Sequence, residues 1–138
     1  MASFLYTSLV DDDSRGNVIY STDTFKTMLV TSSYTPSQTT HTKRSDVTNE
    51  ASGTGYTAGG ATTTVTLTKD TTNNKETLTF SAVSWATSTI TARGAVIYKS
   101  RGGASSADEL VGYIDFGGNI SSTGGTFSIT QSTITKQL

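Results

Sequence analysis

The sequence predicts an all-β protein, folded as a single-domain β-sandwich or jelly roll with long polar loops. Apolar and polar residues alternate with a period of two in about six to eight segments, which follow one another at roughly ten-residue intervals. Turn-forming residues separate these segments, and no segment has a convincing helical period. We expect an N-terminal strand or arm at residues 1–22, followed by the sandwich domain at residues 23–138, with a polar loop or arm at residues 32–46.

The first strand of the sandwich domain is expected at residues 23–31. Phe25 and Leu29 fall on one face of this strand, and Met28 and Val30 fall on the other.

A hairpin is predicted farther along the chain. Residues 63–69 and 73–80 alternate as strands, and the residues between them are rich in turn formers. The alternation then shifts by one residue between Ala82 and Val83, which is typical of a β-bulge inside a continuous strand.

The C-terminal half predicts two central strands and one last strand. Residues 88–100 and 109–117 have apolar residues on both faces, as expected for strands that are buried on both sides. A flexible loop at 101–108 joins them, a glycine-rich turn is expected at 117–125, and residues 126–134 form the last strand.

The composition limits the classes of function. Only 33% of the residues are hydrophobic, so a monomer would have little stability to spare, which favours oligomers. The net charge of −1 indicates neither nucleic acid nor an anionic membrane as a partner. Without cysteine the chain has no disulfide and no thiolate metal site. No signal peptide or membrane-spanning stretch is recognisable, so we expect a soluble protein made in the cytosol.

The glycine-rich stretch at residues 53–60 raises the question of phosphate binding. A P-loop needs a lysine directly after its last glycine, and Ala61 stands there. The dinucleotide fingerprint needs a third glycine where this chain has Ala58. Because a Thr- and Val-rich strand follows, we expect a backbone corner that leads into that strand.

No other group of residues predicts catalysis, a cofactor or a metal. His41, the only histidine, is expected to be a solvated loop residue, since no nucleophile pattern accompanies it. Asp11–Asp13 lacks the EF-hand spacing and is expected to be an exposed acidic turn, which leaves a non-standard calcium site open. Asp108 and Glu109 are expected at a loop–strand junction with no opposing carboxylate. Five aromatic residues are expected in the core, with an exposed sugar-binding platform as the alternative: Tyr34, Tyr56, Trp85, Tyr98 and Tyr113.

Much of the sequence is similar to a family of small structural proteins encoded by tailed-bacteriophage genomes. The resemblance runs from about residue 23 to residue 134, and its most specific parts are GTGYTAGG at 53–60 and STITARGAVIYK at 88–99. It implies a non-enzymatic virion component with a compact β fold. The expected role is a capsid decoration (cement) protein on the outer head shell, and the alternative is a tail or fibre-associated component that contacts the host surface or its glycans.

This role implies the major capsid protein and further copies of the chain as partners. It also implies synthesis in the host cytoplasm and a final location on the capsid surface. The N-terminal segment offers apolar interface candidates, which could instead close the protein's own core: Phe4, Leu5, Tyr6, Leu9 and Val10. The polar loop supplies the other interface candidates: Tyr34, Pro36, His41, Lys43 and Arg44.

Overall fold

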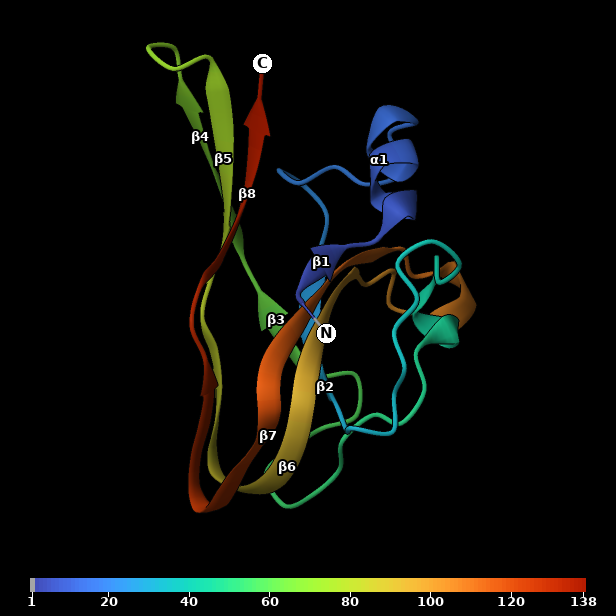
Figure 1. Ribbon diagram of the computed structural model, residues 1–138, viewed down its shortest axis with the longest axis vertical. Helices are drawn as coiled ribbons and strands as arrows, with labels where there is room; N and C mark the ends of the chain where they lie inside the picture. The colour runs from blue at the N-terminus through green and yellow to red at the C-terminus, as the bar shows by residue number, and fades with distance from the viewer. Residues whose placement is uncertain (1) are drawn as a thin grey trace.

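The computed structural model describes residues 2–138 and contains two antiparallel sheets (Figure 1). The larger sheet has the order β1-β7-β6-β2-β3, with the bounds Phe4–Leu5, Leu110–Ile129, Val83–Lys99, Phe25–Val30 and Ala61–Thr63. The smaller sheet has the order β4-β5-β8, with the bounds Val65–Asp70, Lys75–Phe80 and Ser132–Gln137. This architecture confirms the prediction of an all-β, sandwich-like fold.

One long antiparallel ribbon links the two sheets. β6 pairs with β7 in the larger sheet, and β5 pairs with β8 in the smaller sheet. The Phe80↔Ser132 pair of one sheet continues in the same register as the Val83↔Ile129 pair of the other. The ribbon bends at the bottom of the molecule and returns upward, so its two halves face each other (Figure 1).

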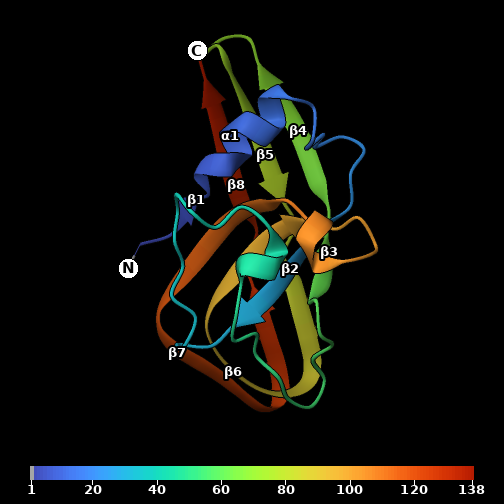
Figure 2. The same cartoon turned by 90° about the vertical axis from the view of Figure 1, so that its right-hand side faces the viewer.

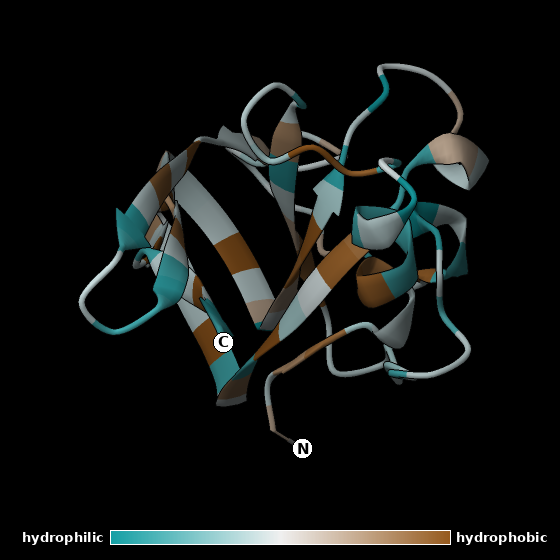
Figure 3. Cartoon of the chain, turned by 90° about the horizontal axis from the view of Figure 1, so that it is seen from above, coloured by the Kyte–Doolittle hydropathy of each residue, from teal (hydrophilic) through white to brown (hydrophobic). Residues whose placement is uncertain are grey.

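The hydrophobic core has three clusters. One lies between the two sheets and joins Phe25 of β2 to Leu78 and Phe80 of β5. A second covers the other face of the larger sheet, where Tyr34 from the loop at 31–50 packs on β2 and β6. Figure 3 shows the hydrophobic and hydrophilic bands that alternate along the strands and supply these clusters.

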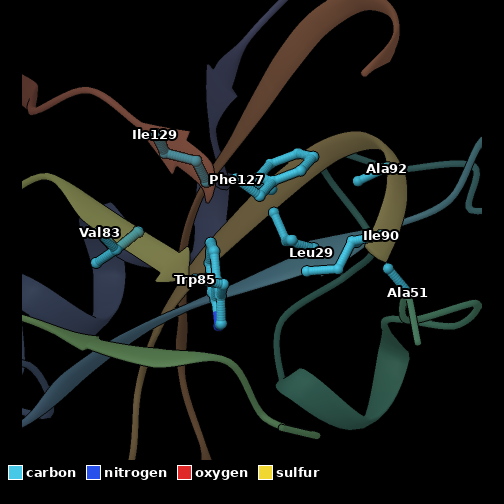
Figure 4. Close-up of a cluster of buried hydrophobic side chains, with 9 residues drawn as sticks. Leu29, Ala51, Val83, Trp85, Ile90, Ala92, Phe127 and Ile129 are labelled. Atoms are coloured by element: carbon cyan, nitrogen blue, oxygen red, sulfur yellow. The ribbon is translucent and has the colours of Figure 1, made fainter. Parts of the chain in front are cut away.

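The third cluster fills the inside of the bend. Trp85, Ile90 and Phe127 lie around Leu29 of β2 in this cluster (Figure 4). Trp85 and Phe127 meet edge to face, with ring centroids 6.2 Å apart. The bend therefore encloses its own core.

The expected N-terminal strand or arm at residues 1–22 is only partly a strand. β1 is short, and Thr7–Ser14 form the helix α1. Leu9 and Asp12 lie three residues apart on one helical face, and both are buried. An eight-residue helix gains its stability from such packing rather than from propensity, which is why no helical period was visible. No helix among residues 2–138 is long and apolar enough to cross a membrane.

Three of the expected strand boundaries were wrong. The last strand, expected at 126–134, is divided, because β7 ends at Ile129 and β8 begins at Ser132. The shift at Val83 is no bulge inside a strand, because β5 ends at Phe80 and β6 begins at Val83. The turn expected at 117–125 is instead part of β7. Gly117 and Gly118 lie where the pairing with β6 is irregular, between Gly94↔Asp115 and Ala92↔Ile120, and Gly124 and Gly125 lie at the irregularity around Ser88↔Gly125, so these glycines allow bulges rather than a reversal of the chain.

The glycine stretch is the predicted corner. Gly53, Gly55, Gly59 and Gly60 all have positive φ, and β3 begins directly after them. The hairpin between β4 and β5 is also confirmed, with the register Val65↔Phe80 to Asp70↔Lys75.

Candidate docking surfaces

The N-terminal segment is fixed to the body and still presents apolar side chains. β1 pairs with β7 through Phe4↔Tyr113 and Leu5↔Gly112. Tyr6 and Leu9 are buried, so these two candidates close the protein's own core. Phe4 is half-buried and packs edge to face against Tyr6. Leu5 is 40% exposed and Val10 is 69% exposed, so these two are available to a partner.

A hydrogen-bonded chain ties the N-terminal segment to the polar loop. The Tyr6 and Tyr34 hydroxyls lie 2.9 Å apart, and the Tyr34 hydroxyl lies 2.8 Å from His41 Nδ1. Because the Ser37 amide donates to the same Nδ1, that nitrogen is the acceptor, so Tyr34 donates to His41 and Tyr6 donates to Tyr34. The expectation of a solvated His41 is therefore corrected, since the ring is half-buried and stacked on Tyr34.

The rest of the polar loop is held against the larger sheet by ion pairs. Lys43 Nζ lies 3.2 Å from Glu109 Oε2, and Arg44 Nε lies 2.8 Å from Asp108 Oδ2. The Arg44 guanidinium also lies over the Tyr98 ring, 5.0 Å from its centroid. Pro36 of this loop is half-buried. The loop at 32–46 therefore folds onto the body rather than extending from it as an arm.

The two acidic residues at 108 and 109 form the centre of an ion-pair cluster. They lie at the predicted loop–strand junction, directly before β7 and after the short helix η2 (Ser105–Ala107), and both are buried. Arg101 adds a second cation to Glu109, at 2.9 Å. Each buried carboxylate thus has a cationic partner, which indicates a structural network rather than an acid–base pair.

The cluster predicts a pH dependence of stability. Burial acts to raise the pKa of Glu109, but hydrogen bonds from Arg101, from the backbone and from Lys43 outweigh it and lower this pKa to about 2. Because the folded pKa lies below the ordinary value of 4.5, this contribution is complete above that value and is lost as the pH falls toward 2. We expect urea unfolding of Glu109→Gln to show a shallower loss of stability over this range than the parent protein. If the free energy of unfolding fell equally steeply with pH in both proteins, the lowered pKa of Glu109 would not be its cause.

Sequence reasoning missed a regular threonine array on the outer face of the smaller sheet. The register places Thr66, Thr79 and Thr133 in one row across β4, β5 and β8. It places Thr68, Thr77 and Thr135 in the next row. We call these six residues the threonine face. A repeated triplet in the sequence could have predicted this face, since Thr-Leu-Thr at 66–68 and 77–79 matches Thr-Ile-Thr at 133–135.

A groove runs between β1 of the larger sheet and β8 of the smaller sheet. It has a volume of about 320 Å³, and no charged residue lines it. Leu5 and Ile114 border it on one side, and Ile134 borders it on the other. Its chemistry suits a neutral, apolar occupant rather than an anion or a metal ion.

The remaining sequence candidates have structural partners. The Asp11–Asp13 run lies in α1 rather than in an acidic turn, and there Asp11 pairs with Arg15 and Asp13 with Lys136. Among residues 2–138, no three acidic or histidine side chains come together as a metal site. Four of the five aromatic residues weighed for sugar binding are buried, and Tyr56 is half-buried with its hydroxyl donating to Glu50. They form no exposed stacking platform.

Searches against protein-family models, curated proteins and solved structures give no significant match to this chain.

Proposed function

We propose that the chain is a non-enzymatic structural protein of a tailed-phage virion, a decoration protein that binds the major capsid protein on the outer head shell. One observation carries the proposal. The N-terminal segment anchors itself through buried Tyr6 and Leu9 while Leu5 and Val10 project outward from a fixed backbone. A preorganised apolar contact of this kind binds without first ordering a loose arm.

The rest of the surface supports a binding role of this type. The chain is close to neutral, and among residues 2–138 only four large apolar side chains besides Leu5 and Val10 are exposed, which suits a non-obligate interface. A single contact through two exposed apolar side chains is weak, but a lattice offers the same contact many times. An assembled particle would therefore retain the protein through several sites at once.

The test measures binding to heads that lack this protein, from the phage that encodes it. We expect Leu5→Asp and Val10→Asp to reduce cosedimentation with heads at least about tenfold, because each places a charge in a desolvated contact. Leu67→Asp is the matched control, since Leu67 is a leucine with 39% exposure against 40% for Leu5 and lies on β4. All three variants should melt within a few degrees of the parent protein, because none of the three side chains is buried.

Two results would overturn this proposal. One is full binding of the Leu5→Asp and Val10→Asp variants. The other is an image of the intact particle that places the chain at the tail tip in a few copies rather than on the head in hundreds.

A further inference from the structure

β8 leaves one side of its backbone without a strand partner. It pairs with β5 on one side, and among residues 2–138 no strand pairs with its other side. Figure 2 shows the C-terminal end of β8 at the outline of the molecule, with α1 crossing in front of the strand below it and no strand on its outer side. Natural proteins protect such edges with charges, prolines or bulges. From Phe116 to Leu138 the sequence has no proline, and Lys136 is its only charged residue.

The backbone hydrogen bonds between β8 and β5 identify the groups of β8 that face outward. The Leu138 amide donates to the Asn74 carbonyl at 3.0 Å, which continues the pairing of β8 with β5. Even-numbered residues of β8 therefore turn their backbone groups toward β5, since the direction alternates along a strand. Thr133 and Thr135 turn their N–H and C=O groups toward the free edge.

We propose that β8 pairs antiparallel with β8 of a second copy, about a two-fold axis perpendicular to the smaller sheet. Such a pair is closed and self-complementary, and it would join two three-stranded sheets into a six-stranded one. The other edge, β4, is a poorer partner for β8. β4 and β8 both run antiparallel to β5, so β4 of a second copy in the same orientation would pair with β8 in parallel, which is the less stable arrangement. β4 also ends in the charged residues Lys69 and Asp70.

Side-chain chemistry selects one register. With Ile134 opposite Ile134 of the second copy, Thr133 lies opposite Thr135 and Lys136 lies opposite Ser132. The two Thr133–Thr135 pairs then exchange backbone hydrogen bonds, and the rows of the threonine face continue across both copies. The neighbouring register that sets Lys136 opposite Ile134 would place Thr135 opposite Thr135 and Thr133 opposite Gln137, so it would keep one threonine pair instead of two and would set a charge against the apolar side chain.

The same register also brings apolar side chains together on the other face of the smaller sheet. Ile134 is half-buried and lines the groove between β1 and β8. The Ile134 of the second copy would stand beside it at the mouth of this neutral groove, and the two side chains would shield each other from water. The pairing is a property of the free chain, so it does not depend on the proposed role in the virion.

The first test uses a disulfide trap on the full chain. The chain has no cysteine, so a single introduced thiol reports one contact. In the proposed register Ile134 forms a non-hydrogen-bonded pair with its symmetry mate, with Cα atoms about 4.5 Å apart, which suits a disulfide. We expect oxidised Ile134→Cys to form a covalent dimer, whereas the control Thr66→Cys on β4 stays monomeric. Preferential trapping of Thr133→Cys or Thr135→Cys instead would overturn the register.

The second test blocks the edge without breaking the monomer. The Thr135 amide faces outward, so Thr135→Pro removes no hydrogen bond to β5. In sedimentation velocity we expect a dimer for the parent protein and at least about a tenfold higher dimer Kd for Thr135→Pro, with a melting temperature close to that of the separated parent monomer. A parent protein that stays monomeric at millimolar concentration, or a Thr135→Pro variant that dimerises as tightly as the parent, would refute the pairing. Because both tests use the purified chain, their outcome is separate from binding to heads.

Discussion

Replacing Gly60 by alanine is expected to lower the free energy of unfolding by at least about 4 kcal/mol. A Cβ at this position would lie 1.9 Å from the carbonyl oxygen of Thr27 and 2.6 Å from the carbonyl carbon. These are backbone atoms of β2, an interior strand of the larger sheet, so they cannot move aside as a flexible side chain would. Urea unfolding monitored by Trp85 fluorescence measures the loss.

Gly102→Ala is the matched control for this experiment. Gly102 has a φ of +80°, close to the +84° of Gly60, but no atom lies within 4 Å of its Cβ position. Its alanine variant therefore reports only the cost of the left-handed backbone, about 1 kcal/mol. Equal losses in the two variants would show that contact with β2 is not what requires glycine at position 60.

Replacing Asp108 by alanine is expected to cost about 3 kcal/mol, or roughly 10 °C in melting temperature. The Asp108 carboxylate is almost fully buried and accepts hydrogen bonds from the Arg44 side chain at 2.8 Å and from the Arg101 amide at 2.9 Å. Its removal leaves a half-buried guanidinium and a backbone amide without these acceptors, and loosens the attachment of the polar loop. Thermal unfolding by circular dichroism measures the effect.

An exposed ion pair supplies the comparison for Asp108. Asp11 pairs with Arg15 one helical turn away, and both side chains are more than 60% exposed. Asp11→Ala should therefore change the stability by less than about 0.5 kcal/mol. A loss for Asp108→Ala no greater than this would mean that the buried carboxylate gains little from its partners.

The sequence was most informative where a local pattern coincides with burial. The period-two alternation at Phe25–Val30 and the turn formers between Val65 and Phe80 each predicted the element that the structure contains. The glycine corner was predictable for the same reason, because its backbone requirement is local. The sequence pattern predicts the conformation of these segments because residues close together in the chain determine that conformation.

The errors occurred where distant contacts decide the conformation. The Gly117–Gly125 segment has the composition of a turn, yet its pairing with β6 makes it part of a long strand. The orientation of the N-terminal interface candidates was unpredictable for a similar reason, since only the packed structure shows that Leu9 is buried and Val10 is exposed. Lys43 and Arg44, which pair with Glu109 and Asp108, lie more than 60 residues away in sequence, so no spacing rule could connect them.

The continuous register between β5–β6 and β7–β8 bears on the order in which the chain folds. Residues 99–109 close the shortest loop of this ribbon, so pairing there carries the smallest entropic cost and each later pair extends an existing ladder. We expect pulse-labelled hydrogen exchange to protect Ala95 and Ile114, whose amides face each other across β6 and β7, before Leu78 and Ile134. A newly made chain would then form the unpaired edge of β8 last, after its own core has formed. This order limits strand pairing between incompletely folded molecules.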